Sequence, residues 1–283
     1  GHHVRLEPLA EHHLDELLPE RGFNVARALV GTEGTCATAL NVTLILTPAM
    51  LKRATVVVAY DDLPGAAAHI HEIMDWRPLG IEAIDSRLFR DEQQEKIAPQ
   101  GLKRLPRPGD NAWLLIQFGS DDAGETEDIA RRFRDWLIHR KGYEKDRIVV
   151  YESRELGGES ELLWKLREGG LGATAFPPDN RDHWPGWEDS AVPPDMVAPY
   201  IRDLGKLYKK YGLQGAMYGH LGQGCIHSRI SFDLRHAEGL KRYRAFLNEA
   251  ADLVISYGGS LSGEHGDGQQ RAEFLDKQYG PEI

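Results

Sequence analysis

Two histidines seven residues apart, His220 and His227, stand in the glycine-rich run YGHLGQGCIH that begins at residue 218. A second glycine-rich run, SGEHGDG from residue 262, carries Glu264 and His265. Two imidazoles and a carboxylate leave a coordination position open, which is what a catalytic divalent metal needs for water or substrate. Glycines permit sharp turns and close backbone approach, so both runs can crowd one small site. We therefore expect His220, His227 and Glu264 to bind a divalent metal.

The neighbouring residues allow further chemistry. His265 is free to act as a base, because a nearby cation disfavours its protonated form and keeps the ring neutral near pH 7. Each histidine taken alone is better explained as a hydrogen-bonded or exposed residue, and only the pairing of the two runs favours a metal. Cys225 could also bind zinc as a thiolate, but a cysteine of this kind is more often a small buried apolar residue.

The elements that must position these residues are strands. Residues 216–218 and 225–232 are typical of two strands joined by the turn 221–224, with His220 at the end of the first. Alternation along the second strand places Cys225, His227, Arg229 and Ser231 on one face. The other face carries Ile226, Ile230 and Phe232 and should point to the core. One face therefore combines imidazoles with a guanidinium, which can hold an anionic group.

Further strands are expected at 54–60, 80–88, 113–118 and 148–151, and helices at 61–76, 125–141, 159–168, 194–211 and 236–257. The run 27–46 predicts a strand, a tight glycine turn and a second strand, and 170–195 predicts a long ordered loop. The order of elements across 54–151 indicates an α+β fold, with a ferredoxin-like antiparallel sheet flanked by helices.

Composition narrows the function classes. The net charge of -10 argues against nonspecific nucleic-acid binding, which needs a basic surface. Cys36 and Cys225 are the two cysteines, so a disulfide framework is not expected and a reducing cytoplasmic compartment fits. No apolar run approaches the roughly 18 residues of a membrane span, so the chain is not expected to be an integral membrane protein. A homo-oligomer stays open.

The two motifs, GH…GCIH at 219–227 and GSLSGEHG at 259–266, resemble the signatures of the FAD-linked oxidase C-terminal domain. That domain occurs in flavin-dependent D-2-hydroxyacid dehydrogenases, including members that oxidise D-lactate, D-2-hydroxyglutarate and glycolate. Residues 28–35 and 44–48 are similar to the last strands of the preceding FAD-binding domain. This form, with Cys225 in the first motif and Arg229 two residues past His227, is closest to a large bacterial subgroup in which an iron–sulfur segment is fused at the C-terminus.

The resemblance implies roles for individual residues. His220, His227 and Glu264 match the metal ligands, for zinc or manganese, and His265 matches the catalytic base. Arg167 matches an arginine that holds the substrate carboxylate, although alone it would be taken for a solvated helix residue. Many members carry Asn where Arg229 stands, so the substrate contacts of those members do not carry over to Arg229. The residues that match a flavin-contacting loop are Gly31, Thr32, Glu33, Gly34 and Thr35, which without the resemblance form an ordinary hairpin turn.

The resemblance also implies a division of the chain. Residues 1–50 match the end of a FAD-binding domain, and 51–283 match the substrate and metal domain, truncated at its C-terminus. The chain is thus expected to be a fragment, inactive alone, of a flavin- and metal-dependent oxidoreductase. The intact enzyme would oxidise a small D-2-hydroxyacid to a 2-oxoacid by hydride transfer to FAD, which is held by a domain largely missing here.

Electrons would then pass to an acceptor, for which a fused iron–sulfur segment is a candidate. The expected location is cytoplasmic, with peripheral attachment to the inner membrane left open. Two rival interpretations remain at this point. One is a flavin-independent metal hydrolase that uses the same His/His/Glu site with His265 as the base. The other is a non-catalytic docking domain whose histidines only stabilise the fold.

Overall fold

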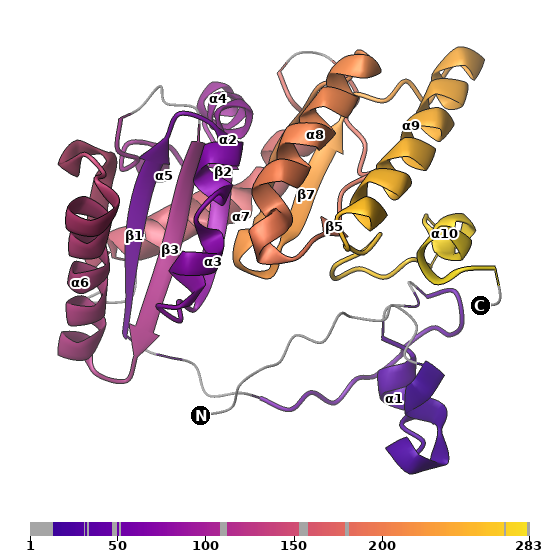
Figure 1. The fold of residues 1–283 in the computed structure, drawn as a ribbon, viewed down its shortest axis with the longest axis horizontal. Helices are drawn as coiled ribbons and strands as arrows, with labels where there is room; N and C mark the ends of the chain where they lie inside the picture. The colour runs from indigo at the N-terminus through magenta and orange to yellow at the C-terminus, as the bar shows by residue number, and fades with distance from the viewer. Residues whose placement is uncertain are drawn as a thin grey trace.

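The computed structural model describes residues 14–30, 32, 34–46, 50, 52–107, 112–152, 158–178, 181–268 and 270–281. In this part of the chain seven strands form one antiparallel sheet, in the order β4-β1-β3-β2-β6-β7-β5 (Figure 1). The strands are β1 (Lys52–Tyr60), β2 (Gly80–Asp85), β3 (Ala112–Ser120), β4 (Ile148–Glu152), β5 (Ser190–Ala191), β6 (Gly215–His220) and β7 (Cys225–Ile230).

Helices flank this sheet. The α-helices of the described residues are α1 (Val25–Ala28), α2 (Leu63–Ala67), α3 (Ile70–Met74), α4 (Ser86–Glu95), α5 (Pro99–Leu102), α6 (Ala123–Lys141), α7 (Glu159–Ala175), α8 (Val197–Lys210), α9 (Ala237–Ser256) and α10 (Leu275–Tyr279). Short 3₁₀ helices are η1 (Leu14–Leu17), η2 (Pro19–Arg21), η3 (Lys145–Arg147), η4 (Pro194–Met196), η5 (Leu221–Gln223) and η6 (Ala272–Phe274). The predicted α+β class is confirmed.

The first four strands form the ferredoxin-like half of the sheet. Their spatial order, β4-β1-β3-β2, comes from two strand–helix–strand units wound into one antiparallel sheet. Strand β1 pairs with β3 along its whole length, from Lys52 opposite Ser120 to Tyr60 opposite Ala112. The topology predicted for this half is therefore confirmed.

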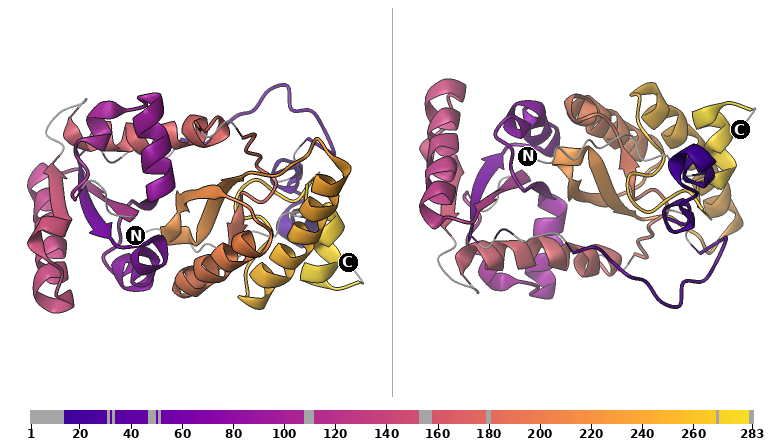
Figure 2. Two further views of the ribbon diagram at one scale, coloured as in Figure 1. Left: turned by 90° about the horizontal axis from the view of Figure 1, so that it is seen from above. Right: turned by 90° about the horizontal axis from the view of Figure 1, so that it is seen from below.

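Both faces of this half are covered by helices. Val56 and Val58 of β1 pack with α2, α3 and α6 on one face, whereas Val57 and Ala59 pack with α4, α5 and α7 on the other. All four side chains are fully buried. A strand buried on both faces is apolar throughout rather than alternating, which explains the unbroken apolar run at 54–60. The sheet is the middle of three layers (Figure 2).

Strands β6, β7 and β5 extend the sheet beyond β2. Strand β2 pairs with β6 from Glu82 opposite His220 to Ile84 opposite Tyr218, and β6 pairs in turn with β7. Helices α8 and α9 cover the face that carries Ile226 and Ile230 (Figure 1). Both side chains and Phe232 are buried, as predicted. The opposite face of β6 and β7 faces α7 and carries the histidines.

Gly219 lets β6 and β7 approach closely. Its φ of 144° lies in a region that residues with a side chain rarely adopt. A Cβ at this position would lie 2.6 Å from the carbonyl oxygen of Cys225. Only glycine therefore fits before His220, which ends β6.

Four predictions of local structure were wrong. The strand expected at 80–88 ends at Asp85, and residues 86–88 begin α4. Residues 27–46 do not form two strands: the described ones show α1 and then no regular structure. Leu40, Val42 and Leu44 are 69–88% exposed, and no described strand pairs with this segment, so β-branched residues alone did not make a strand. The helix expected over 61–76 is broken into α2 and α3. The loop expected from residue 170 begins later, because α7 continues to Ala175.

The glycines of α7 explain this last difference. A Cβ on Gly169 would lie 2.7 Å from Cγ2 of Ile97, so the missing side chain lets α7 pack closely on the segment after α4. Tertiary packing thus outweighs the low helix propensity of glycine. None of the described helices combines the length and the apolar character that crossing a membrane requires.

Candidate metal and substrate site

Three separate parts of the chain bring the predicted metal ligands together. His220 ends β6, His227 lies on the adjacent β7, and Glu264 belongs to the loop that follows α9. The ring centroids of His220 and His227 are 5.4 Å apart. Figure 1 shows that this loop returns from the end of α9 to the sheet beside β5, where Ser260 bridges to Ala191. Residues 44 positions apart in the sequence therefore share one site.

The Glu264 carboxylate joins the two histidines. Its Oε1 lies 3.2 Å from Nε2 of His220, and its Oε2 lies 3.4 Å from Nε2 of His227. The same nitrogen of each ring thus points at one carboxylate. The structure brings the three predicted ligands together, and each offers an atom of the type that zinc or manganese accepts.

The other nitrogen of each ring is held by a second partner. Nδ1 of His220 lies 2.6 Å from Oε1 of Glu82, and Nδ1 of His227 donates to the carbonyl oxygen of Glu188 at 2.9 Å. Metal-binding histidines usually donate their second N–H to a carboxylate or carbonyl, which fixes the tautomer and leaves Nε2 for the metal. These residues offer donor atoms that a divalent metal accepts, but Nη2 of Arg167 lies 3.0 Å from Nε2 of His220, so metal binding at that nitrogen requires Arg167 to move aside.

The electrostatics of the cluster favour ionised groups. Burial lowers the pKa of His227, but hydrogen bonds to Glu188 and Glu264 outweigh burial and raise this pKa to about 10. Burial raises the pKa of Glu188, but hydrogen bonds from His227 and His265 lower it to about 2. The hydrogen bond from His227 also lowers the pKa of Glu264. The carboxylates thus stay charged in a half-buried place, where a cation can replace the shared protons.

Two other donor groups lie in the same region. One combines Asp189, Cys225, His227 and Glu264, and the other combines Glu188, His227 and His265, each with ligand atoms within 4.8 Å of one another. Burial raises the pKa of the Cys225 thiol, so the thiolate that a metal would need is disfavoured. Both groups share His227 with the predicted set, whereas neither contains His220.

His265 lies next to the ligands and is stacked on His227. Their ring centroids are 5.4 Å apart with an interplanar angle of 14°. Nδ1 of His265 lies 2.7 Å from Oε1 of Glu188, and this hydrogen bond raises the pKa of His265. Its Nε2 lies 4.0 Å from Oε2 of Glu264. The position fits the predicted base, but the raised pKa opposes the neutral ring expected near pH 7, and the role itself stays a prediction.

Arg167 reaches the site from α7. Its Nε donates to Oε2 of Glu82 at 2.8 Å, and its Nη2 lies 3.0 Å from Nε2 of His220. The structure therefore brings Arg167 to the predicted ligands, and the interpretation as a solvated helix residue is wrong. Its contact with a substrate carboxylate stays a prediction.

Arg229 lies on the same face of β7 as His227. It pairs with Ala216 of β6, two positions along from the pair of Tyr218 with His227. Its Nε is buried and has no hydrogen-bond partner in the described part of the protein. The side chain is only partly buried, so the guanidinium can receive an anionic group at this face.

The predicted flavin-contacting turn is described in part. Gly31 and Glu33 lie outside the described residues. The hydroxyl of Thr32 donates to the carbonyl of Leu29 at 2.9 Å, and that of Thr35 donates to the carbonyl of Thr32 at 2.6 Å. These hydroxyls close the turn on itself, and its contact with flavin stays a prediction.

Three carboxylates of the site were missed in the sequence analysis: Glu82, Glu188 and Asp189. Glu82 could have been recognised from the sequence, because it is a charged residue within the apolar run Gly80–Asp85. Such a residue is rarely buried without a partner. Asp189 is fully buried and accepts four hydrogen bonds from the Glu264 loop. Glu188 and Asp189 fall in the stretch expected to be a loop, where no periodicity marks a side chain as buried.

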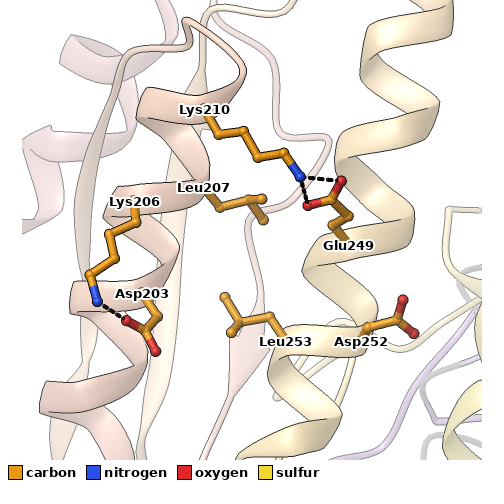
Figure 3. A pocket seen from close by; sticks show the side chains of 7 residues that line it. All are labelled: Asp203, Lys206, Leu207, Lys210, Glu249, Asp252 and Leu253. Carbon is orange, nitrogen blue, oxygen red and sulfur yellow. Dashed lines mark hydrogen bonds and ion pairs between the residues drawn. The ribbon is translucent and has the colours of Figure 1, made fainter.

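A surface groove of about 650 Å³ lies elsewhere, between α8 and α9 (Figure 3). Its lining residues are Asp203, Lys206, Leu207, Lys210, Glu249, Asp252 and Leu253. The two lysines are already paired with carboxylates, as the dashed lines in Figure 3 mark. No predicted site residue lines this groove, so we do not assign the chemistry to it.

The sequence of this chain is similar to those of known proteins. The sequence profile of the family described as FAD linked oxidases, C-terminal domain, matches residues 50–283. D-2-hydroxyglutarate dehydrogenase of Haemophilus influenzae is 27% identical over 271 residues, which cover 93% of this chain and 26% of that protein. D-lactate dehydrogenase of Archaeoglobus fulgidus is 25% identical over 262 residues, which cover 91% of this chain and 53% of that protein. The chain thus spans only a quarter to a half of the length of these relatives.

A solved structure shares the architecture. The 4-ethylphenol oxidase from Gulosibacter chungangensis is similar with a TM-score of 0.51 and 13% identity, over 81% of this chain and 49% of that one. Identity at this level shows a common fold alone. The likeness agrees with the antiparallel sheet and its flanking helices.

Proposed function

Since this chain belongs to the FAD-linked oxidase C-terminal domain family, we propose that it carries the metal and substrate site of a flavin-dependent D-2-hydroxyacid dehydrogenase. The reaction is the oxidation of the hydroxyacid to the 2-oxoacid. The observation that carries this proposal is the convergence of Nε2 of His220 and Nε2 of His227 on the Glu264 carboxylate. The names of the dehydrogenase relatives support the substrate class.

The residues of this chain have separate roles in the proposed reaction. When bound, a divalent metal supplies Lewis acidity to the substrate hydroxyl, and FAD supplies the acceptor for the hydride from C2. His220, His227 and Glu264 hold the metal, and Glu82 orients His220. His265 takes the hydroxyl proton at its Nε2, which faces the ligands.

Two arginines orient the substrate. Arg167 holds the carboxylate beside the hydroxyl, because it lies 3.0 Å from the ligand His220. Arg229 lies further along the same face and has a buried Nε without a partner among the described residues. Its side chain is only partly buried, so the exposed end of the guanidinium can hold a second carboxylate on the substrate. We therefore propose a dicarboxylic hydroxyacid of the 2-hydroxyglutarate type as the preferred substrate.

The remaining features are proposed on the same basis. Residues 1–50 belong to the end of a FAD-binding domain, and 51–283 form the substrate and metal domain. Electrons leave through an iron–sulfur segment of the same polypeptide, and the enzyme acts in the cytoplasm. The relatives named D-2-hydroxyglutarate dehydrogenase are long enough for such additional parts, since this chain covers 26% of one of them.

The test is a substrate panel with the flavin-loaded holoenzyme and an artificial electron acceptor. We expect turnover of D- but not L-2-hydroxyacids. D-2-hydroxyglutarate should exceed D-2-hydroxyvalerate, which has the same carbon chain without the second carboxylate. A hydrogen bond to a charged group contributes about 1.5–3 kcal/mol, so kcat/KM should differ by about 10- to 150-fold.

This substrate panel tests the role of Arg229 separately from the proposed reaction. Equal kcat/KM for the two acids would refute the role of Arg229 but leave the reaction in place. A colourless protein that binds metal and oxidises none of these acids would refute the proposed reaction and favour the metal hydrolase.

A further inference from the structure

Glu188 faces the Nδ1 edges of the two stacked imidazoles, His227 and His265. It precedes β5, and its side chain is 14% exposed. Oε1 lies 2.7 Å from Nδ1 of His265, and Oε2 lies 3.6 Å from Nδ1 of His227. One carboxylate thus faces the same nitrogen of both rings, on the side away from Glu264.

This contact determines which nitrogen of His265 is free. When Nδ1 donates to Glu188, the lone pair of the neutral ring resides on Nε2. That atom lies on the side of the metal ligands, 4.0 Å from Oε2 of Glu264. Stacking on His227 at 14° fixes the plane of the ring. A carboxylate that holds the far nitrogen of a histidine base is a known way to select tautomer and orientation.

The backbone of His265 is held by another residue. Its N–H donates to Oδ2 of Asp189 at 2.8 Å, and the N–H of Glu264 donates to the same oxygen at 3.1 Å. The loop therefore keeps its path when Glu188 changes. What Glu188 contributes separately is the orientation and tautomer of the His265 ring.

We propose that Glu188 is a positioning residue for the base His265, a role that rests on the proposed hydroxyacid oxidation. In that reaction the O–H bond of the substrate breaks and its proton goes to Nε2 of His265. The C2–H bond breaks as its electron pair leaves with the hydrogen to FAD, and C2–O becomes a carbonyl. Glu188 keeps Nε2 free and aimed at the hydroxyl, and it accepts a hydrogen bond from the protonated ring.

The competing role for Glu188 is that of a metal ligand, since Glu188, His227 and His265 also lie within reach of one ion. The two roles predict different losses. A ligand that is removed lowers metal content, whereas a positioning residue that is removed lowers turnover with metal retained.

The first experiment compares Glu188→Ala, Glu188→Gln and Glu188→Asp with the wild-type holoenzyme. We expect unchanged metal content in all three and KM within about threefold, because the arginines hold the substrate. Loss of an outer partner of a catalytic histidine costs about 10- to 100-fold, which we expect in kcat for Glu188→Ala. Glu188→Gln should lose less, since its amide oxygen can still accept from Nδ1. Glu188→Asp should recover most of the turnover.

A matched control is Glu238→Gln, which removes an exposed carboxylate paired with Lys241 on α9. It should leave metal content, KM and kcat unchanged. Unchanged kcat in Glu188→Ala, or loss of metal in Glu188→Gln, would overturn the proposal. A parallel loss in the Glu238 variant would overturn it as well, because the effect would then be one of net charge.

The second experiment does not depend on turnover. Nitrogen-15 NMR of the metal-loaded, histidine-labelled protein reports the tautomer of His265, which His265→Ala assigns by the loss of its signals. We expect Nδ1 protonated and Nε2 unprotonated in the wild type, with a mixture of tautomers in Glu188→Ala. An unchanged tautomer would contradict the role of Glu188. If the wild type oxidises no hydroxyacid, the proposed function fails, while this spectrum still decides whether Glu188 fixes the ring.

Discussion

Substitution of Asp189 by Asn should loosen the loop that carries both Glu264 and His265. Asp189 is fully buried, and its Oδ2 accepts hydrogen bonds from the Ser262 hydroxyl and from three backbone N–H groups. Burial raises the pKa of Asp189, but these hydrogen bonds outweigh burial and lower it, so the carboxylate is ionised. One charged oxygen therefore holds four consecutive residues, 262–265.

The magnitude follows from the loss of charge. Hydrogen bonds to a charged group contribute about 1.5–3 kcal/mol, and neutral ones about half of that. Asn keeps the shape and one acceptor oxygen, so each of the four bonds loses about 1 kcal/mol. Because the four bonds share one oxygen, the losses are not additive, and we expect about 2–3 kcal/mol in all. For a chain of this size that lowers Tm by about 5–10 °C.

The assay combines thermal unfolding with calorimetric titration of zinc and manganese. Since Glu264 is a proposed metal ligand on the loosened loop, metal affinity should fall by about 10- to 100-fold. Asp195→Asn, an exposed change close by in η4, is the control and should alter neither quantity. Unchanged Tm and affinity in Asp189→Asn would refute the claim that this carboxylate anchors the loop. A lower Tm with full affinity would show that Asp189 serves the fold but not the site.

Two further predictions concern backbone strain and a buried carboxyl group. Gly219→Ala should destabilise the protein by about 1–3 kcal/mol in denaturant unfolding, because the new Cβ meets the Cys225 carbonyl at an unfavourable φ. The control Gly258→Ala has open space around it and should cost about 1 kcal/mol. Equal losses in the two variants would contradict the steric argument. Burial raises the pKa of Glu92 from 4.5 to about 8. As pH rises, Glu92 therefore ionises in the unfolded chain before it does so in the folded protein. The free energy of unfolding thus falls between these two pH values, by up to about 3 kcal/mol at pH 7. Glu92→Met should therefore stabilise the protein at pH 7 and flatten its pH dependence over that range, while the exposed Glu95→Met should not. A Glu92→Met variant no more stable than wild type would refute the raised pKa of this buried carboxyl.

Parts of the fold could be predicted because local and global signals agree. The unbroken apolar run at 54–60 and the amphipathic helix now seen as α6 needed no knowledge of their partners. The segment 34–46 has similar β-branched residues, yet it forms no strand among the described residues. Its apolar side chains are exposed, so a pairing partner rather than composition decides the outcome.

The candidate site, like the fold, could be predicted from the sequence only in part. His220, His227 and Glu264 could be predicted, since glycine-rich runs with metal-binding side chains are visible in the sequence. The carboxylates that orient them could not, because Glu82, Glu188 and Asp189 act only through contacts with residues far along the chain. Glu82 and His220 are 138 positions apart and meet where β2 pairs with β6.

The central claim is that His220, His227 and Glu264 bind a divalent metal beside the base His265. Metal content of the purified wild type, His227→Ala and His265→Ala, measured by mass spectrometry after dialysis against zinc or manganese, tests it most directly. We predict stoichiometric metal in the wild type and in His265→Ala, and none in His227→Ala, with circular dichroism confirming that all three are folded. Stoichiometric metal in His227→Ala, or a folded wild type without metal, would contradict the account.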